Sequence, residues 1–394
     1  MQKLLFLFLS ILKFFHKVRL FFTGKKEEDI TEQRIVSGKA WEEFCDQLKL
    51  AGNVLKYPGT PQDIFQQTEG IRYLTRLLRG GLEAYVEYSD PSFPVLRRMV
   101  HETVKMGADN PDNYYFNAPV NGKYEYRITG NRNTIHYIGF FTQNGNYGTT
   151  GGLAPCGIIQ GNDLILEKDG SFEIILSKIQ KGKNWLKIED DTTILMVRQT
   201  FLHRFKEVPA ELHIENLSGK KTPDPLSPKV IDEGLKQAAM FVAGAPVLFA
   251  RWANGFQKHS NQLPQFDPEI SNAAGGDADI IYYHSHWKLK NDEALVIHVK
   301  PPKCDTWNFQ LNNYWMESLD YRYFNICINM GNAQYENDGS VKVIVAHRDP
   351  GLPNWLNTSS HNEGTMCWRW YRLADNENPI EPKCEVVNFK SLLQ

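Results

Sequence analysis

The chain has 394 residues, of which 42% are hydrophobic and 12% aromatic, and its formal net charge is −2. This composition excludes a disordered polymer and allows two domains or one large domain. Residues 1–26 hold six Lys or Arg and no acid, which leaves 38 basic against 46 acidic residues in the remainder. An acidic body is a poor binder of phosphates, so a nucleic-acid partner is not expected.

The N-terminal segment 1–26 predicts an amphipathic helix. Its apolar run ends at Lys13, well short of the ~20 residues that a membrane span needs. On a helix, lysines and phenylalanines would fall on different faces, which is typical of a basic helix lying on a membrane surface. A membrane-associated, monotopic protein is therefore expected. A cleaved secretory signal, giving a secreted or endoplasmic-reticulum protein, and a helix docked on its own chain remain alternatives.

The pattern of helix, strand and turn signals divides the rest of the chain into four parts. Residues 27–115 predict helices: Thr60-Pro61 is typical of a helix start, and Gly80-Gly81 of its end. Residues 116–220 consist of short β-type runs separated by Gly, Asn and Asp. Residues 221–283 predict a helical insert, and β-type runs return over 284–389.

The two β-rich parts repeat one pattern. The tripeptide Asn-Trp-Leu occurs at 184–186 and again at 354–356. Each copy follows an Asp-Gly-Ser turn, at 169–171 and at 338–340, and precedes an arginine, Arg198 or Arg369. Such self-similarity indicates an internal duplication of an antiparallel β unit. We interpret Asn-Trp-Leu as structural, with Trp185 and Trp355 buried at equivalent positions.

Several longer motifs carry a family resemblance. "DNPDNYYFNAP", "AGGDADIIYY" and "VAHRDPGLPNWLNT" are similar to the domain-of-unknown-function family 1214, with a resemblance from about residue 41 to 387. It implies an α+β, mostly β fold: an N-terminal helical segment plus two duplicated antiparallel β-sandwich or jelly-roll-like units with a helical insert between them. It implies no catalytic residue and no reaction.

Common catalytic and nucleotide-binding signatures are absent, so no cofactor is expected. The strand-like "YYHSHW" places His284 and His286 on one face and makes them weak candidates for a metal site, although two half-exposed histidines beside aromatic residues explain the pattern better. The six cysteines include no Cys-x-x-Cys pair, which favours free thiols over a disulfide framework.

The loops of the second repeat have gained polar and aromatic residues that the first repeat lacks. The candidate catalytic residues are His347, Asp349 and His361, with ligand contacts expected from Trp355, Trp368, Trp370 and Arg369. Arg369 is the weakest member, because Arg198 matches it in the first repeat. Alternation along a strand would also turn it away from Trp368 and Trp370.

Three functions follow from these residues. The first is a membrane-associated protein that binds an amphipathic or aromatic small molecule, with its aromatic loops as walls. The second is a hydrolase or metal-assisted enzyme that uses the His and Asp residues of the second repeat. The third is a structural or assembly protein. The expected partners are a membrane surface, through 1–26, and a small ligand, with self-association left open.

Overall fold

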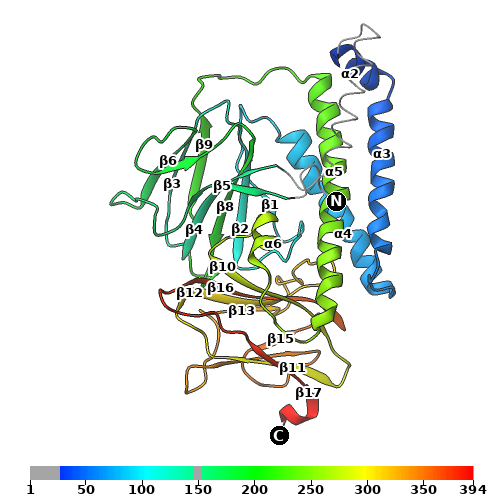
Figure 1. The fold of residues 1–394 in the computed structure, drawn as a ribbon, viewed down its shortest axis with the longest axis vertical. Helices are drawn as coiled ribbons and strands as arrows, with labels where there is room; N and C mark the ends of the chain where they lie inside the picture. The colour runs from blue at the N-terminus through cyan, green and yellow to red at the C-terminus, as the bar shows by residue number, and fades with distance from the viewer. Residues whose placement is uncertain (1–26, 146–151, 394) are drawn as a thin grey trace.

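The computed structural model describes residues 27–145 and 152–393. Figure 1 shows two β-sandwiches, one above the other, with long helices along one side of the molecule. The predicted α+β, mostly β class is confirmed. The predicted membrane-surface helix at 1–26 lies outside the described residues. None of the helices in the described ranges combines the length and apolarity that crossing a membrane would require.

The first sandwich contains a five-stranded sheet, ordered β1-β2-β8-β4-β5, and a four-stranded sheet, ordered β7-β6-β3-β9. Its core lies between these sheets and is built from the inward-facing residues of each strand. The strands are β1 (Arg97–Val100), β2 (Asn113–Pro119), β3 (Tyr126–Asn131), β4 (Tyr137–Asn144), β5 (Ala154–Ile159), β6 (Ser171–Ser177), β7 (Trp185–Lys187), β8 (Thr192–Thr200) and β9 (Glu211–Asn216).

The second sandwich contains two four-stranded sheets, ordered β10-β16-β12-β13 and β15-β14-β11-β17. These orders match those of the first sandwich when β2 through β9 are replaced by β10 through β17. Only β1 has no counterpart, so the strand order supports the duplication. The strands are β10 (Ile280–Lys288), β11 (Glu293–Val299), β12 (Cys304–Leu311), β13 (Cys327–Asn329), β14 (Val341–Ala346), β15 (Trp355–Asn357), β16 (Glu363–Leu373) and β17 (Lys383–Asn388).

The repeated tripeptide forms the short parallel strands β7 and β15. Asn184 donates to Ile165 O and Glu173 O, both at 2.9 Å, and Asn354 donates to Gln334 O at 2.7 Å and Lys342 O at 3.0 Å. The leucine that ends each copy is fully buried. The two Trp side chains, expected to be buried, are only half-buried, and each indole N–H donates to a carbonyl of the neighbouring strand at 3.1 Å.

The helical layer consists of α2 (Glu27–Val36), α3 (Lys39–Ala51), α4 (Ile64–Leu82) and α5 (Pro228–Phe256), with the short α6 (Pro268–Ala273) beside the sandwiches. Single turns extend or connect the elements: η1 (Gly52–Lys56), η2 (Glu83–Glu87), η3 (Gln257–His259) and η4 (Phe389–Leu393). In Figure 1, α5 runs along both sandwiches, and it packs against α3 and α4. The helices share a core with residues of the second sandwich, which fixes the layer in place.

Two predicted helix boundaries were wrong. The cap of α4 is Asp63, which accepts a hydrogen bond from Gln66 N at 3.0 Å, whereas the Thr60 hydroxyl bonds to carbonyls of the preceding turn. Gly80 and Gly81 do not end the helix, which continues through them into η2. A side chain at Gly81 would meet the Phe241 ring of α5 at 3.2 Å, so this glycine permits close helix packing.

Candidate ligand-binding site between the two sandwiches

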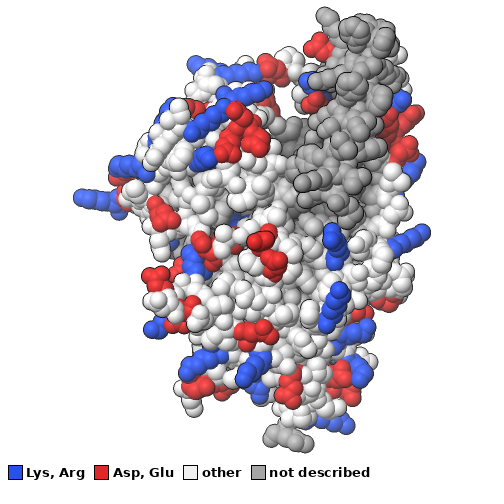
Figure 2. Space-filling model, in the orientation of Figure 1, with Lys and Arg blue, Asp and Glu red and all other residues white. Residues whose placement is uncertain are grey.

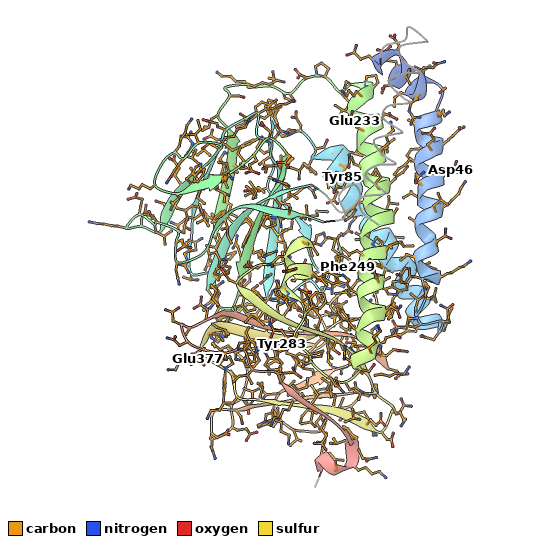
Figure 3. The ribbon with its side chains drawn as sticks, in the orientation of Figure 1. Asp46, Tyr85, Glu233, Phe249, Tyr283 and Glu377 are labelled. Carbon is orange, nitrogen blue, oxygen red and sulfur yellow. The ribbon has the colours of Figure 1, made fainter. Side chains whose placement is uncertain are left out.

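A cavity of about 130 Å³ lies between the facing sheets of the two sandwiches. Strands β2 and β8 contribute to one wall and β10 and β16 to the other, while α5 and the loop after α6 close the sides. Figure 3 labels Phe249, which comes from α5 at the level where the sandwiches meet and lines the cavity. Trp252 of the same helix also lines the cavity. The walls combine these aromatic rings with polar side chains such as Asn110 and Asn113.

Equivalent residues of the two repeats face this cavity. Tyr115 pairs with Arg198 across β2 and β8, and Tyr282 pairs with Arg369 across β10 and β16. All four side chains line the cavity. The arginines are buried, at 8% exposure for Arg198 and 4% for Arg369. The duplication therefore brings two copies of one Tyr-Arg pair to a single site.

Each arginine is held by the loop that leads into the other repeat. Arg369 donates to Ala108 O at 2.5 Å, and Arg198 donates to Gly275 O at 2.7 Å. Both carbonyl residues have positive φ, 58° at Ala108 and 88° at Gly275, so the two loops share a backbone turn. These reciprocal contacts fix the sandwiches against each other at the cavity.

The two guanidinium groups differ in their charge partners. Arg198 lies 3.4 Å from a carboxylate oxygen of Asp277. Arg369 bonds to the neutral oxygens of Gln310 at 2.6 Å and Asn308 at 3.3 Å, and no carboxylate of the described chain lies within 4.0 Å of it. A buried charge without an opposite charge is costly, so Arg369 is well placed to receive an anionic group.

A buried carboxylate, that of Asp109, lies near Arg369 but does not pair with it. The Asp109 carboxylate accepts bonds from the backbone N–H and the hydroxyl of Ser318, at 3.0 and 2.8 Å. Burial raises the pKa of Asp109, and Lys105 opposes that rise. Lys105 donates to Ser318 O at 2.7 Å and Leu319 O at 3.0 Å, and burial lowers its pKa.

His284 is a neutral, buried imidazole on the cavity wall. Burial, and secondarily the charge of Arg369, lower the pKa of His284 to about 3. Its ring stacks between those of Phe256 and Tyr282, with interplanar angles of 5° on both sides. Its Nε2 lies 3.8 Å from Cys367 Sγ, and its Nδ1 has no hydrogen-bond partner within the described part of the chain. One nitrogen is therefore free to meet a bound molecule.

The contact between Cys367 and His284 lacks the properties of an activated nucleophile. Burial raises the pKa of the Cys367 thiol to about 11, while that of the imidazole is low. A reactive cysteine needs a lowered pKa and partial exposure. Cys367 has neither, so the cavity is better suited to binding than to covalent catalysis.

The structure does not gather the candidate catalytic residues around this cavity. His347 bonds through Nδ1 to the Thr358 hydroxyl at 2.8 Å, and His361 contacts the carbonyl of the same threonine at 3.1 Å. His361 is buried against Glu69 of α4, with 2.6 Å between Nε2 and the carboxylate. Asp349 lies in an exposed turn, where it accepts from Gly351 N at 2.7 Å. The two histidines therefore share a neighbour, but Asp349 orients neither.

The candidate ligand-binding residues separate in the same way. Trp368 and Trp370 are fully buried in the core of the second sandwich, stacked against Trp307 and edge-on to it. They lie on the sheet face opposite Arg369, so they are core residues rather than cavity walls. Trp355 packs at the far sheet beside Ile344 and does not line the cavity either. Of this set, Arg369 alone reaches the cavity.

The two histidines of "YYHSHW" are both buried and have different surroundings. His286 is satisfied by Ser260 at 2.8 Å and Glu363 at 3.2 Å, whereas His284 faces the cavity. Among the residues that the structure describes, no three His, Cys, Asp or Glu side chains come together in a way that could hold a metal ion.

Arg198, Tyr115 and Tyr282 line the cavity but are not predicted as site residues from the sequence. A usable signal was present in "GADNPDNYY" and "AGGDADIIY", which precede the two repeats and align without a gap. A matched pair of arginines can mean a shared structural role or two halves of one site. Only the docking of the two sheets distinguishes these meanings.

The fold and this cavity define a two-sandwich protein with a buried cationic site between its repeats. The family profile described as "Protein of unknown function (DUF1214)" matches residues 286–374, in the second sandwich. A solved structure of an uncharacterized protein from Burkholderia cenocepacia is 47% identical, with a TM-score of 0.89, over 91% of this chain and 99% of that chain. The chain therefore belongs to the DUF1214 family. The profile supports only the C-terminal part of the resemblance expected over 41–387.

A second solved structure, the VPA0106 protein from Vibrio parahaemolyticus, is 12% identical, with a TM-score of 0.47, over 87% of this chain and 100% of that chain. No curated protein matches the chain.

Proposed function

We propose that the protein binds a small, partly aromatic molecule with an acidic head in the cavity between its sandwiches. The observation that carries this proposal is Arg369, a buried guanidinium that faces a cavity and has no carboxylate partner in the described chain. Desolvating an ion costs several kcal/mol in proteins, and the neutral oxygens of Gln310 and Asn308 offset that cost only in part. A carboxylate on the ligand would complete the pairing through charge-assisted hydrogen bonds.

The walls and the size of the cavity support an aromatic body for this ligand. Phe249, Trp252 and Tyr371 line it together with the Tyr-Arg pairs. Its volume of about 130 Å³ is comparable to the engineered cavity of about 150 Å³ that binds benzene in another protein. A benzene ring with one acidic substituent is therefore the scale of ligand that the site supports. His284 Nδ1 offers this ligand one further polar contact.

Benzoate is a suitable probe, and benzamide is its neutral counterpart of equal size. We expect calorimetric titration to show benzoate binding, with benzamide at least roughly tenfold weaker because it lacks the charge that Arg369 requires. Arg369→Met should abolish benzoate binding and Arg369→Lys should retain part of it, with thermal melting confirming that each variant is folded. Equal binding of benzoate and benzamide, or unchanged binding by Arg369→Met, would refute the anionic site.

Binding is favoured over hydrolysis, because His347, Asp349 and His361 share no cavity with the arginines and because Cys367 is not activated. A cationic site confined to the interior is also consistent with the outer surface. Figure 2 shows acidic and basic side chains intermixed over the described residues of the face in view, without a broad basic area there.

Attachment to a membrane surface through residues 1–26 remains part of this proposal. The six basic residues and the absence of acids in that segment support it. Deleting 1–26 should remove flotation with liposomes that contain anionic lipid. Equal flotation of the full chain and the truncated chain would reject the attachment without affecting the cavity.

A further inference from the structure

We infer that Asp277 is a built-in counter-ion that closes the Arg198 half of the cavity, so that the site selects ligands with a single negative group, bound at Arg369. This inference rests on the proposed binding function and specifies the charge of its ligand. It is carried by a comparison of the two loops that lead into the repeats.

The loops 107–113 and 274–280 have the same structure. Asn110 and Asp277 each lie five residues before a cavity tyrosine, and each donates its backbone N–H to that tyrosine's hydroxyl, at 2.9 Å and 3.2 Å. Each also accepts, through its side-chain oxygen, the N–H two residues further on, at 2.9 Å and 3.1 Å. Asn110 and Asp277 are therefore equivalent positions.

The chemical difference between these positions sets the charge of each half. In one half, the second oxygen of Asp277 faces Arg198 at 3.4 Å, and the pair is neutral. In the other half, the corresponding atom of Asn110 is an amide nitrogen, which donates to the Tyr371 hydroxyl at 2.6 Å. The amide cannot neutralise Arg369. One carboxylate replaced by its amide thus leaves one of the two equivalent arginines open.

The other carboxylates near Arg369 do not form an ion pair with it. Asp109 is committed to Ser318, as described above. Asp112 is buried, and burial raises its pKa to about 6. Neither carboxylate lies within ion-pair distance of Arg369; Asp109 lines the cavity with its oxygens bonded to Ser318, and Asp112 does not line it. A ligand carboxylate at Arg369 would supply the charge that Asp277 supplies to Arg198.

A monoanion fits this arrangement, whereas a dianion would place its second charge at Arg198, whose charge Asp277 already neutralises. Like charges at close range are strongly unfavourable in a buried site. The equivalence of the two loops provides a reciprocal experiment with isosteric substitutions. Asn110→Asp should neutralise Arg369, and Asp277→Asn should open Arg198.

The test measures affinity by calorimetry for benzoate, for succinate and for succinamate, the monoamide of succinate, which has the same size and one charge less. Wild type should bind succinamate at least roughly tenfold more tightly than succinate. Asn110→Asp should weaken benzoate at least roughly tenfold, whereas Asp277→Asn should retain benzoate and reverse the preference toward succinate. The double variant Asn110→Asp/Asp277→Asn keeps the total charge, moves the open arginine to the first half, and should regain benzoate binding.

The outcomes distinguish a failure of the proposed binding function from a failure of the inference about Asp277. Failure of wild type to bind benzoate would overturn the proposed function, and this inference with it. Benzoate binding that Asn110→Asp leaves unchanged would overturn this inference alone, and so would an absence of any preference between succinate and succinamate in both wild type and Asp277→Asn. Recovery in the double variant would exclude misfolding as the cause of the loss in Asn110→Asp.

Discussion

The side chain of Asn184 should contribute more to the stability of the first sandwich than its small size suggests. It donates to Ile165 O and Glu173 O, both at 2.9 Å, and accepts from Ile165 N at 2.8 Å. The residue is 6% exposed, so water cannot replace these partners after truncation. At about 1 kcal/mol net for each hydrogen bond, Asn184→Ala should lower the free energy of unfolding by about 3 kcal/mol.

Urea unfolding followed by tryptophan fluorescence would measure this loss. Lys183→Ala is the matched control. The Lys183 side chain, next to Asn184 in the sequence, is exposed, and its ion pair with Glu167 should contribute less than about 1 kcal/mol. Asn354 makes the same three bonds at a φ of 56°, so Asn354→Ala adds strain of about 1–2 kcal/mol that Asn354→Gly avoids. A loss below about 1 kcal/mol for Asn184→Ala would refute the structural interpretation of the tripeptide.

Three further predictions concern burial. Because the pKa of His284 is about 3 in the folded chain and near 6.5 when unfolded, the unfolded state binds its proton first as pH falls. Wild type should therefore lose about 3 kcal/mol more stability than His284→Gln between pH 7 and 4, and equal pH profiles in denaturant titrations would contradict this. Trp368→Ala should cost about 3–5 kcal/mol and Trp355→Ala roughly half as much, since only the first is fully buried; equal losses in urea unfolding would contradict it. Cys367 should resist iodoacetamide at pH 8 until the chain is unfolded, as peptide mass spectrometry would show, and rapid native labelling would argue against its buried thiol.

The sequence predicted the architecture better than it predicted the limits of the repeats and helices. The repeated turn, tripeptide and arginine were enough to indicate the duplication. The strand equivalence begins upstream of the predicted starts at 116 and 284, with β2 at Asn113 and β10 at Ile280. The tyrosines and loops that complete the cavity lie in or near these omitted stretches. Helix α4 passes through Gly80-Gly81 because tertiary packing on Phe241 outweighs the low helix propensity of glycine.

The candidate site was predicted only in part, because side-chain type was weighed above position. Their aromatic rings make Trp368 and Trp370 candidates from sequence, but the period of two along β16 turns them into the core and turns Arg369 to the other face. The match with Arg198 argues from sequence for a structural role of Arg369, yet the same match marks the cavity. The sequence contains the equivalence of the arginines but not the docking of the two sheets, which depends on long-range packing.

A crystal structure with bound 4-bromobenzoate tests the central claim most directly, because bromine locates the ligand by its anomalous signal. We expect one bromine peak inside the cavity near Phe249 and Trp252, with the carboxylate within hydrogen-bonding distance of the Arg369 guanidinium. Bromine peaks only outside the cavity, or a carboxylate turned away from Arg369, would contradict it.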